Sequence, residues 1–409
     1  MISLKTHSIS IISKGFQLGS AFLLFILTSR WLGADGRGEI SLYIANQTIL
    51  QLATEIIFGS GYIYLIHRYE RGSIIFKGLI WSLLCSLILP IIFYWLGIQP
   101  FDSMGWLTLS SFLYSLFTWM TLDIRAQERI GLYNVLWIIY STLLLIYFII
   151  LFSLYKDAAS YYMSISAALL SVIFIGLYFV IRTKFPPHSQ PIAWKSLLKE
   201  GSSSVWSNWI NFFSTRSSFY IITWFIQKES AVGLYAAAAM FSELIWIIPY
   251  ALAIPLYPLI SKSNSSLDTL KYVNTTALLN AQLSIVAFLF LLLVPESIIT
   301  AVIGESFTGI KPIILLLIPG TYFLSQGKIY WNYFQGTGGF IVNTRTALYS
   351  FVVTVALLIL LVPFLGLNGA AIATGIGYIL YAYLLIKNYQ KVDNKSILYY
   401  FFPFARKDN

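Results

Sequence analysis

The chain has 409 residues, of which 58% are hydrophobic and only 10% are charged, and its mean hydropathy is +0.76. Soluble globular proteins are about 25% charged, so this composition excludes an ordinary soluble domain and indicates an integral membrane protein. The net charge of +10 does not predict a nucleic-acid partner, because excess Lys and Arg in a membrane protein mostly reflects orientation. The single cysteine, Cys85, excludes an intrachain disulfide, and the three histidines lie in polar flanks, so we expect no metal and no cofactor.

Long apolar runs separated by short breaks predict twelve membrane-spanning helices, because a helix needs about 20 apolar residues to cross a bilayer. The predicted spans are 9–32, 39–66, 78–98, 105–124, 132–154, 161–181, 202–226, 234–260, 272–294, 312–335, 347–365 and 370–387. The breaks are rich in Gly, Pro and charge, such as the predicted outer turn Gly33–Gly38. The first run is too long for a cleavable signal peptide. The sequence therefore predicts an all-α polytopic membrane protein.

The distribution of basic residues predicts the orientation of these spans. Most of the 26 lysines and arginines fall on the side that holds both termini and the even-numbered loops. Loops rich in Lys and Arg stay in the cytoplasm, so we expect both termini to be cytoplasmic. We expect a multi-pass protein of the bacterial cytoplasmic (inner) membrane.

The longest polar stretch falls midway along the chain and predicts two halves. We expect a six-helix bundle at residues 1–181, a cytoplasmic linker at 182–201, a second six-helix bundle at 202–387 and a cytoplasmic tail at 388–409. An even number of spans in each half gives both halves the same orientation, as in parallel repeats.

The stretch Gly201–Ile260 reads as a hairpin of two apolar helices that each contain a charge, Arg216 in the first and Glu243 in the second. A charge at mid-membrane costs roughly 2.5–3.5 kcal/mol even on a lenient scale, so it normally faces a bundle interior or a wet cavity. This hairpin predicts a polar passage through the bundle.

Polar side chains recur at helical spacing in three spans, which places them on one face of each helix. A polar stripe facing lipid is costly, so we expect these faces to line a shared cavity. The predicted lining residues on these stripes are Gln51 and Glu55 in the second span, Asn208, Asn211 and Arg216 in the seventh, and Lys328 and Asn332 in the tenth, whose stripe also contains Ser325. Trp209, on an aromatic face beside Arg216, and Glu243 of the eighth span complete the predicted site.

Each of these residues also has a purely structural interpretation. Amides and hydroxyls often hydrogen-bond neighbouring membrane helices, and Arg216 and Glu243 could form a buried ion pair. Trp246 and Tyr250, one and two turns beyond Glu243, could stack on a sugar or simply pack. Asp123 lies near a span end, where a charged side chain can reach the interface.

Several stretches resemble one family of membrane proteins. They are Arg30–Gly38, Ser218–Ser261 with its Glu-Ser-Ala-Val-Gly-Leu-Tyr turn at Glu229–Tyr235, Ile313–Gly320, and Pro363–Thr374. In order and spacing they resemble the O-antigen/polysaccharide lipid flippases (Wzx-type) of the multidrug/oligosaccharidyl-lipid/polysaccharide (MOP) exporter superfamily. The resemblance covers nearly the whole chain.

The resemblance implies two six-helix bundles around a central, often cationic cavity. It implies transfer of an undecaprenyl-diphosphate-linked oligosaccharide from the cytoplasmic to the periplasmic leaflet, by a membrane protein that is not an enzyme. A polysaccharide polymerase is a plausible partner, and we expect a monomer. This chain departs from many relatives in having Ser217 and Ser218 where an acidic residue follows the arginine of the seventh helix, and Glu243 is the nearest substitute.

Three functions remain open on the sequence alone. In a flippase, Arg216 and Lys328 would hold the diphosphate, and Glu55 or Glu243 would bind a coupling proton or sodium ion. A multidrug or cation antiporter of the same superfamily would favour acidic residues in the cavity, whereas the charges inside the membrane here balance. A membrane-embedded glycan polymerase or acyltransferase usually needs a large loop or an intramembrane histidine, and the sequence predicts neither.

Overall fold

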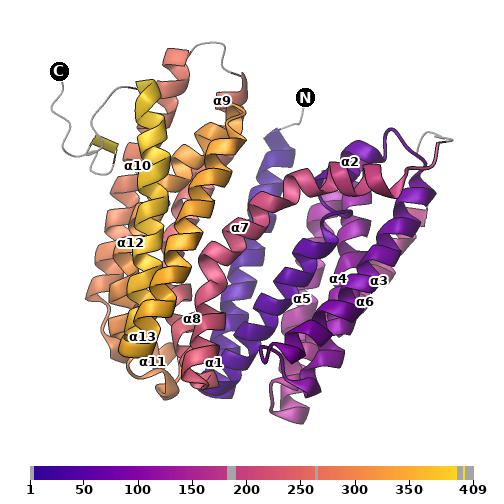
Figure 1. Cartoon of the computed structure of the whole chain (residues 1–409). Coiled ribbons are helices and arrows are strands. Elements are labelled where there is room, and N and C mark those ends of the chain that lie inside the picture. Colours follow the sequence, from indigo (N-terminus) through magenta and orange to yellow (C-terminus); the bar gives the residue numbers. More distant parts are fainter. Residues whose placement is uncertain (1–3, 182–189, 263–265, 394–398, 401–409) are drawn as a thin grey trace. The chain divides into compact units, whose positions relative to one another are not determined.

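The computed structural model describes residues 4–181, 190–262, 266–393 and 399–400. Regular structure in these residues is entirely helical, which confirms the all-α prediction. Figure 1 traces the elements from indigo to yellow. They are α1 (Leu4–Thr54), α2 (Ser60–Leu65), α3 (Arg71–Trp95), α4 (Phe101–Ala126), α5 (Ile130–Tyr155), α6 (Ala159–Ile181), α7 (Trp194–Ile226), α8 (Glu229–Glu243), the 3-10 helix η1 (Leu244–Trp246), α9 (Ile247–Lys262), α10 (Ser266–Leu293), α11 (Glu296–Ile303), the 3-10 helix η2 (Glu305–Phe307), α12 (Ile310–Gly336) and α13 (Phe340–Asp393).

Two of these helices are each long enough to supply two predicted spans. α1 has a non-helical residue at Gly33 (φ 68°), and α13 has one at Gly366 (φ 55°). Positive φ is accessible to glycine at little cost, so these glycines let the chain bend where the first and eleventh predicted spans end. Each of the predicted spans therefore has a helical counterpart, and the protein is a multi-pass membrane protein.

Eight helices of the described chain are long and apolar enough to cross a membrane, by length and composition. α1 and α13 count once each among them, and α4 and α7 are not included. Both of these helices carry many polar side chains, and α4 buries serines at positions 103, 110, 111 and 115. Their low hydropathy fits helices that face other helices more than lipid.

The chain forms two compact units, Met1–Trp209 and Ile210–Asn409. The division falls inside α7, because this helix already begins at Trp194, within the predicted linker 182–201. Residues 182–189 of that linker, and residues 394–398 and 401–409 of the predicted tail, lie outside the described residues.

The structure corrects three predicted elements. The second span, 39–66, is not one helix, because α1 ends at Thr54 and the short α2 begins at Ser60. The eighth span, 234–260, is interrupted by η1, which separates α8 from α9. The turn Gly33–Gly38 is helical after Gly33. Just beyond it, the Glu39 carboxylate accepts a hydrogen bond from the Tyr162 hydroxyl at 2.8 Å.

Unit 1 is held together at one end by a buried charge. Asp123 of α4 is fully buried and accepts hydrogen bonds from Arg71 of α3 at 3.1 and 2.8 Å and from the Tyr62 hydroxyl at 2.8 Å. Trp119 also donates to that hydroxyl at 3.2 Å. Asp123 has the structural role expected for it, but as a buried carboxylate that joins α2, α3 and α4 and not as a side chain that reaches the interface.

The first turns of α7 pack against the same end of unit 1. Ile192 and Leu197 are buried in a cluster with Phe58, Tyr62 and neighbouring apolar residues. Gly201 contacts the α1 end so closely that an added Cβ would overlap the Ile56 carbonyl oxygen. Only glycine fits at this crossing, so residue 201 fixes where α7 meets the end of α1.

Unit 2 relies on close backbone packing between α12 and α13. A Cβ at Gly320 would lie 2.5 Å from the Cα of Gly375, and one at Gly327 would lie 3.0 Å from the Cα of Ala382. Small residues allow membrane helices to approach in this way. These small residues therefore let α12 pack closely against the second half of α13.

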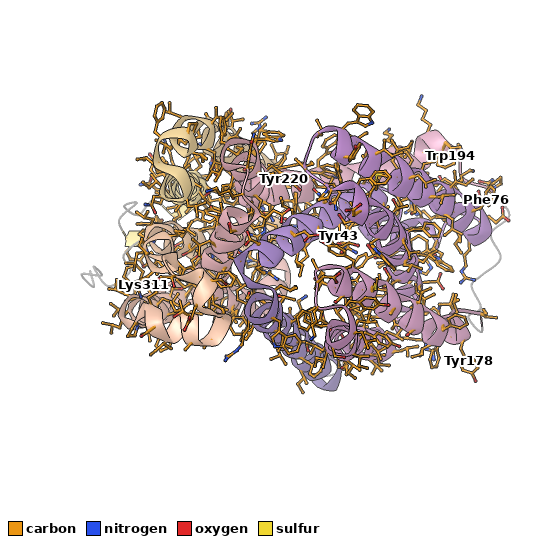
Figure 2. All side chains as sticks on the ribbon, turned by 90° about the horizontal axis from the view of Figure 1, so that it is seen from below. Tyr43, Phe76, Tyr178, Trp194, Tyr220 and Lys311 are labelled. Atoms are coloured by element: carbon orange, nitrogen blue, oxygen red, sulfur yellow. The ribbon has the colours of Figure 1, made fainter. Side chains whose placement is uncertain are left out.

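A basic side chain also caps a helix end in unit 2. The Lys311 ammonium donates to the carbonyls of Leu291, Leu292 and Val294 at 2.6, 3.0 and 2.6 Å, which satisfies the C-terminus of α10. Figure 2 shows the side chains from below, with Lys311 and Tyr220 labelled on unit 2 and the exposed Phe76 and Tyr178 on the outside of unit 1.

We predict that Asp123→Ala destabilises the protein by about 3 kcal/mol, because it leaves the Arg71 guanidinium without its anion and Tyr62 without its acceptor. Arg71 is 27% exposed, so the effect belongs at the low end for a broken buried pair. The measurement is thermal unfolding of the purified protein. Asp102→Ala, at the exposed start of the same helix, is the control and should cost at most about 1 kcal/mol. Equal shifts for both variants would contradict the assignment.

We also predict that Gly201→Ala lowers the apparent melting temperature, because the methyl group has no room beside the Ile56 carbonyl. Gly105→Ala in α4 is the matched control, since nothing lies within 4 Å of its added Cβ. That control should be neutral or slightly stabilising, because Ala is favoured over Gly in a helix by up to about 1 kcal/mol. A Gly201→Ala protein as stable as the parent would show that α7 does not pack this tightly.

Candidate functional site

The local sequence explains why three charged side chains of unit 2 come together. α8 ends at Glu243, η1 occupies Leu244–Trp246, and α9 follows with Pro249 in its first turn. Proline suits the first turn of a helix but cannot donate to a carbonyl of a preceding turn. The interruption therefore places Glu243 and Trp246 on a short tight turn, with α7 and α12 as neighbours that supply Arg216 and Lys328.

Arg216 of α7 and Glu243 of α8 form a bidentate ion pair. Nη1 donates to Oε1 at 2.7 Å and Nη2 donates to Oε2 at 2.8 Å. The Arg216 side chain is 30% exposed and the Glu243 side chain is 12% exposed. Parallel, charge-assisted hydrogen bonds of this kind are strong and fix the orientation of both side chains. The ion pair that the sequence left open as a structural interpretation of Arg216 and Glu243 is therefore present.

Lys328 of α12 is held by aromatic rings. Its ammonium lies 3.7 Å from the ring centroid of Trp246 and 4.3 Å from that of Tyr250, and it donates to the Tyr250 hydroxyl at 2.9 Å. A cation over a ring face is stabilised by the ring quadrupole, by about 0.5–2 kcal/mol. The faces that could have stacked on a sugar are therefore directed at Lys328.

Trp246 is itself fixed in place. Its indole N–H donates to the Thr321 carbonyl at 3.2 Å, about two turns before Lys328 on the same helix. Its ring meets that of Tyr378 from α13 edge to face, at a centroid distance of 5.5 Å. With 7% exposure, Trp246 is a rigid floor beneath the ammonium.

The charges of this cluster do not cancel. Within the described residues, ion pairs join Arg71 to Asp123 and Arg216 to Glu243, and no carboxylate oxygen lies within 4.0 Å of the Lys328 ammonium. Lys328 nevertheless interacts electrostatically with both Glu243 and Arg216. Two cations and one carboxylate give the cluster a formal charge of +1, which suits an anion.

The remaining predicted polar residues of unit 2 make hydrogen bonds within or between helices. Ser325 is fully buried and exchanges hydrogen bonds with Asn280 and Ser284 of α10 at 3.0–3.3 Å, so it joins helices. Asn332 is half-buried and donates to the Lys328 carbonyl at 2.7 Å, one turn away on the same helix. Asn211 of α7 is exposed, and its carbonyl accepts a hydrogen bond from Thr215.

Four predicted site residues belong to unit 1. Asn208 donates to the Glu55 carboxylate over a long 3.4 Å contact, just beyond the end of α1. The backbone carbonyl of Gln51, one turn earlier, accepts a hydrogen bond from the Glu55 backbone N–H at 2.8 Å. Trp209 is half-buried at the last position of the unit. Unit 1 therefore gathers Glu55 and Asn208, and unit 2 gathers Arg216, Glu243 and Lys328.

Sequence reasoning missed the partners of these charges more than the charges themselves. The aromatic contacts of Lys328 come from another helix, so helical spacing within α12 carries no signal for them. The link between Asp123 and Arg71 joins residues 52 positions apart, and no local pattern marks it. No group of three His, Cys, Asp or Glu side chains that could hold a metal occurs in the part of the chain that the structure describes.

We predict that Arg216→Met and Glu243→Leu each destabilise the protein by about 2 kcal/mol, and that the double variant recovers most of the loss. Removing one partner leaves a half-buried charge unpaired, whereas removing both is often nearly neutral. The measurement is a double-mutant cycle on thermal unfolding of the purified protein. Additive losses would show that the two side chains do not act as a pair.

No family model matches the chain. It is 25% identical, over 94% of its own length and 94% of the relative's, to an uncharacterized membrane protein of Haemophilus influenzae. Its fold is similar to that of the lipid II flippase MurJ in an inward closed conformation, with a TM-score of 0.76 and 14% identity over 100% of this chain and 94% of MurJ.

The fold is also similar to an inward-facing multidrug resistance MATE family transporter of the MOP superfamily. The TM-score is 0.70 and the identity 14%, over 95% of each chain. A second MATE transporter, VcmN of Vibrio cholerae, matches with a TM-score of 0.58 at 15% identity over 97% of this chain and 96% of VcmN. At these identities the likeness extends to the fold alone.

Proposed function

We propose that this protein is a flippase for an undecaprenyl-diphosphate-linked oligosaccharide, an O-antigen or capsule repeat unit. It would carry this substrate from the cytoplasmic to the periplasmic leaflet of the bacterial inner membrane by alternating access. In this proposal it works as a monomer, with both termini in the cytoplasm, and delivers its substrate to a polysaccharide polymerase.

The observation that carries the proposal is the uncompensated Lys328. An ammonium among membrane helices is expensive without an anion, and in the described residues Lys328 has ring faces and a hydroxyl in place of a carboxylate. A diphosphate group is an anion of the right kind for such a site. The lipid tail would stay in the bilayer, so only the head group has to enter the protein.

Arg216 would join Lys328 as the second diphosphate ligand. Two of its N–H groups are committed to Glu243, and guanidinium has five donors in all. Asn332 and Asn211 in unit 2, and Gln51, Asn208 and Trp209 in unit 1, would line the route of the sugar. The similarity of the fold to a lipid II flippase supports a lipid-linked substrate.

The coupling ion would bind at a carboxylate. Glu243 already contacts Arg216, so an incoming diphosphate that competes for the guanidinium would leave Glu243 free to take up a proton or sodium ion. Glu55 is the alternative ion site, since in the described residues it has one long contact with Asn208 and no basic partner within 4.0 Å.

A multidrug or cation antiporter is the second candidate, and Glu55 is the observation that favours it. An unneutralised carboxylate in unit 1 suits a cationic drug, and the fold is similar to a multidrug resistance transporter. The cluster in unit 2 favours the flippase, because Arg216 is paired with Glu243, the one carboxylate of the cluster, and the formal charge of the cluster is positive.

We predict that Lys328→Ala, expressed at the parental level, lowers surface glycan by at least about tenfold in cells that depend on this protein, since it removes a charge-assisted contact worth about 1.5 kcal/mol or more. Lys271→Ala, an exposed lysine of α10, is the matched control and should have no effect. The measurement is quantitative glycan staining, with drug susceptibility scored on the same strains. Unchanged glycan together with raised drug susceptibility would replace the flippase with the antiporter.

A further inference from the structure

We propose that Tyr250 is a third anion ligand beside Lys328 and Arg216, and that its hydroxyl donates a hydrogen bond directly to a phosphate oxygen of the substrate. This inference rests on the proposed function and deepens it, because it assigns a neutral donor beside the cation and explains why the rings surround Lys328.

The direction of the hydrogen bond between the two side chains follows from their chemistry. An ammonium has three donors and no acceptor, so the 2.9 Å contact must run from Lys328 to the Tyr250 oxygen. The phenol therefore acts as the acceptor here, and its own proton remains available. A phenol that accepts from a cation is also polarised into a better donor, because successive hydrogen bonds strengthen one another.

The Tyr250 proton has room to reach a ligand. The residue is 59% exposed, in contrast to Trp246 at 7%. Among the described residues, the Tyr250 hydroxyl makes one hydrogen bond, in which it accepts from Lys328. The ammonium therefore contacts one buried ring, that of Trp246, and one exposed ring, that of Tyr250, which carries a hydrogen-bond donor.

The geometry places two donors side by side for a single anion. The Lys328 nitrogen and the Tyr250 oxygen are 2.9 Å apart, and the centroid of the Trp246 ring lies 3.7 Å from the same nitrogen. The unused N–H groups of Lys328 and the O–H of Tyr250 can then approach two oxygens of one phosphate group. A single lysine binds phosphate as a point charge, and a neighbouring hydroxyl adds direction.

The division of labour within the cluster supports this assignment. In the structure both terminal nitrogens of Arg216 are bound to Glu243, so Lys328 and Tyr250 are the donors of the cluster that can receive the anion before Arg216 is released from Glu243.

The test is binding of farnesyl diphosphate to the purified full-length protein, with farnesol and inorganic pyrophosphate as parallel probes. Tyr250→Phe keeps the ring face and removes the hydroxyl, and it should weaken farnesyl diphosphate binding by about tenfold, as expected for a lost hydrogen bond to a charged group. Tyr349→Phe, an exposed tyrosine of α13, is the matched control and should bind like the parent. Farnesol binding should be unaffected by either change.

A second variant separates donation to the ligand from mere support of Lys328. Replacement of Tyr250 by 3-fluorotyrosine, assayed at a pH where the phenol stays protonated, makes the hydroxyl a stronger donor and a weaker acceptor. Tighter farnesyl diphosphate binding than in the parent supports the proposal, and weaker binding overturns it. Equal loss of pyrophosphate binding in Tyr250→Phe also supports it and shows that the phosphate alone is recognised.

The outcomes also distinguish this inference from the proposed function. If Lys328→Ala abolishes binding and Tyr250→Phe binds like the parent, the inference is overturned and the phosphate site at Lys328 stands. If Lys328→Ala also binds like the parent, or the parent binds no diphosphate probe, the site assignment of the proposed function fails and this inference fails with it.

Discussion

The ion pair between Arg216 and Glu243 is the interaction on which the arrangement of unit 2 depends. A single charge inside a membrane helix is costly, and the bidentate geometry offsets that cost for two of the three charged groups. Because Glu243 is taken by Arg216, Lys328 needs another environment, which the rings of Trp246 and Tyr250 supply. The interruption of the helix between α8 and α9 makes both contacts possible, since it sets Glu243 and Trp246 on one short turn.

Much of the fold follows from the sequence, for reasons that are physical. Apolar runs of about 20 residues predict membrane spans because a bilayer leaves few alternatives, and each predicted span has a helical counterpart. The breaks at residues 55–59 and 244–246 were not predicted, because residues 56–58 and 244–246 are apolar and continue the hydrophobic run of their spans. Pro249 marked the second break, but proline is tolerated in membrane helices and did not by itself indicate a 3-10 turn.

The candidate site was predictable as a set of residues and not as a set of contacts. Arg216, Glu243 and Lys328 stand out in the sequence because charges are rare inside apolar runs. Which side chain meets which depends on how helices are rotated about their axes, and spacing within one helix carries no such information. Ser325 illustrates the limit, since it shares the stripe of Lys328 and yet hydrogen-bonds to Asn280 and Ser284 of a neighbouring helix.

A fold shared by multidrug transporters and a lipid II flippase does not by itself select a substrate. In the described residues Lys328 has no carboxylate oxygen within 4.0 Å, and this positive charge is the reason for proposing an anionic substrate. The most direct measurement of the proposed function is transfer of an undecaprenyl-diphosphate oligosaccharide across liposomes that contain the purified protein, followed by oxidation of the exposed sugars with membrane-impermeant periodate. We expect the protein to make the inner pool of sugars accessible to periodate, and Lys328→Ala to do so much more slowly. An inner pool that stays protected at the rate of empty liposomes, with a folded protein and an imposed proton or sodium gradient, would contradict it.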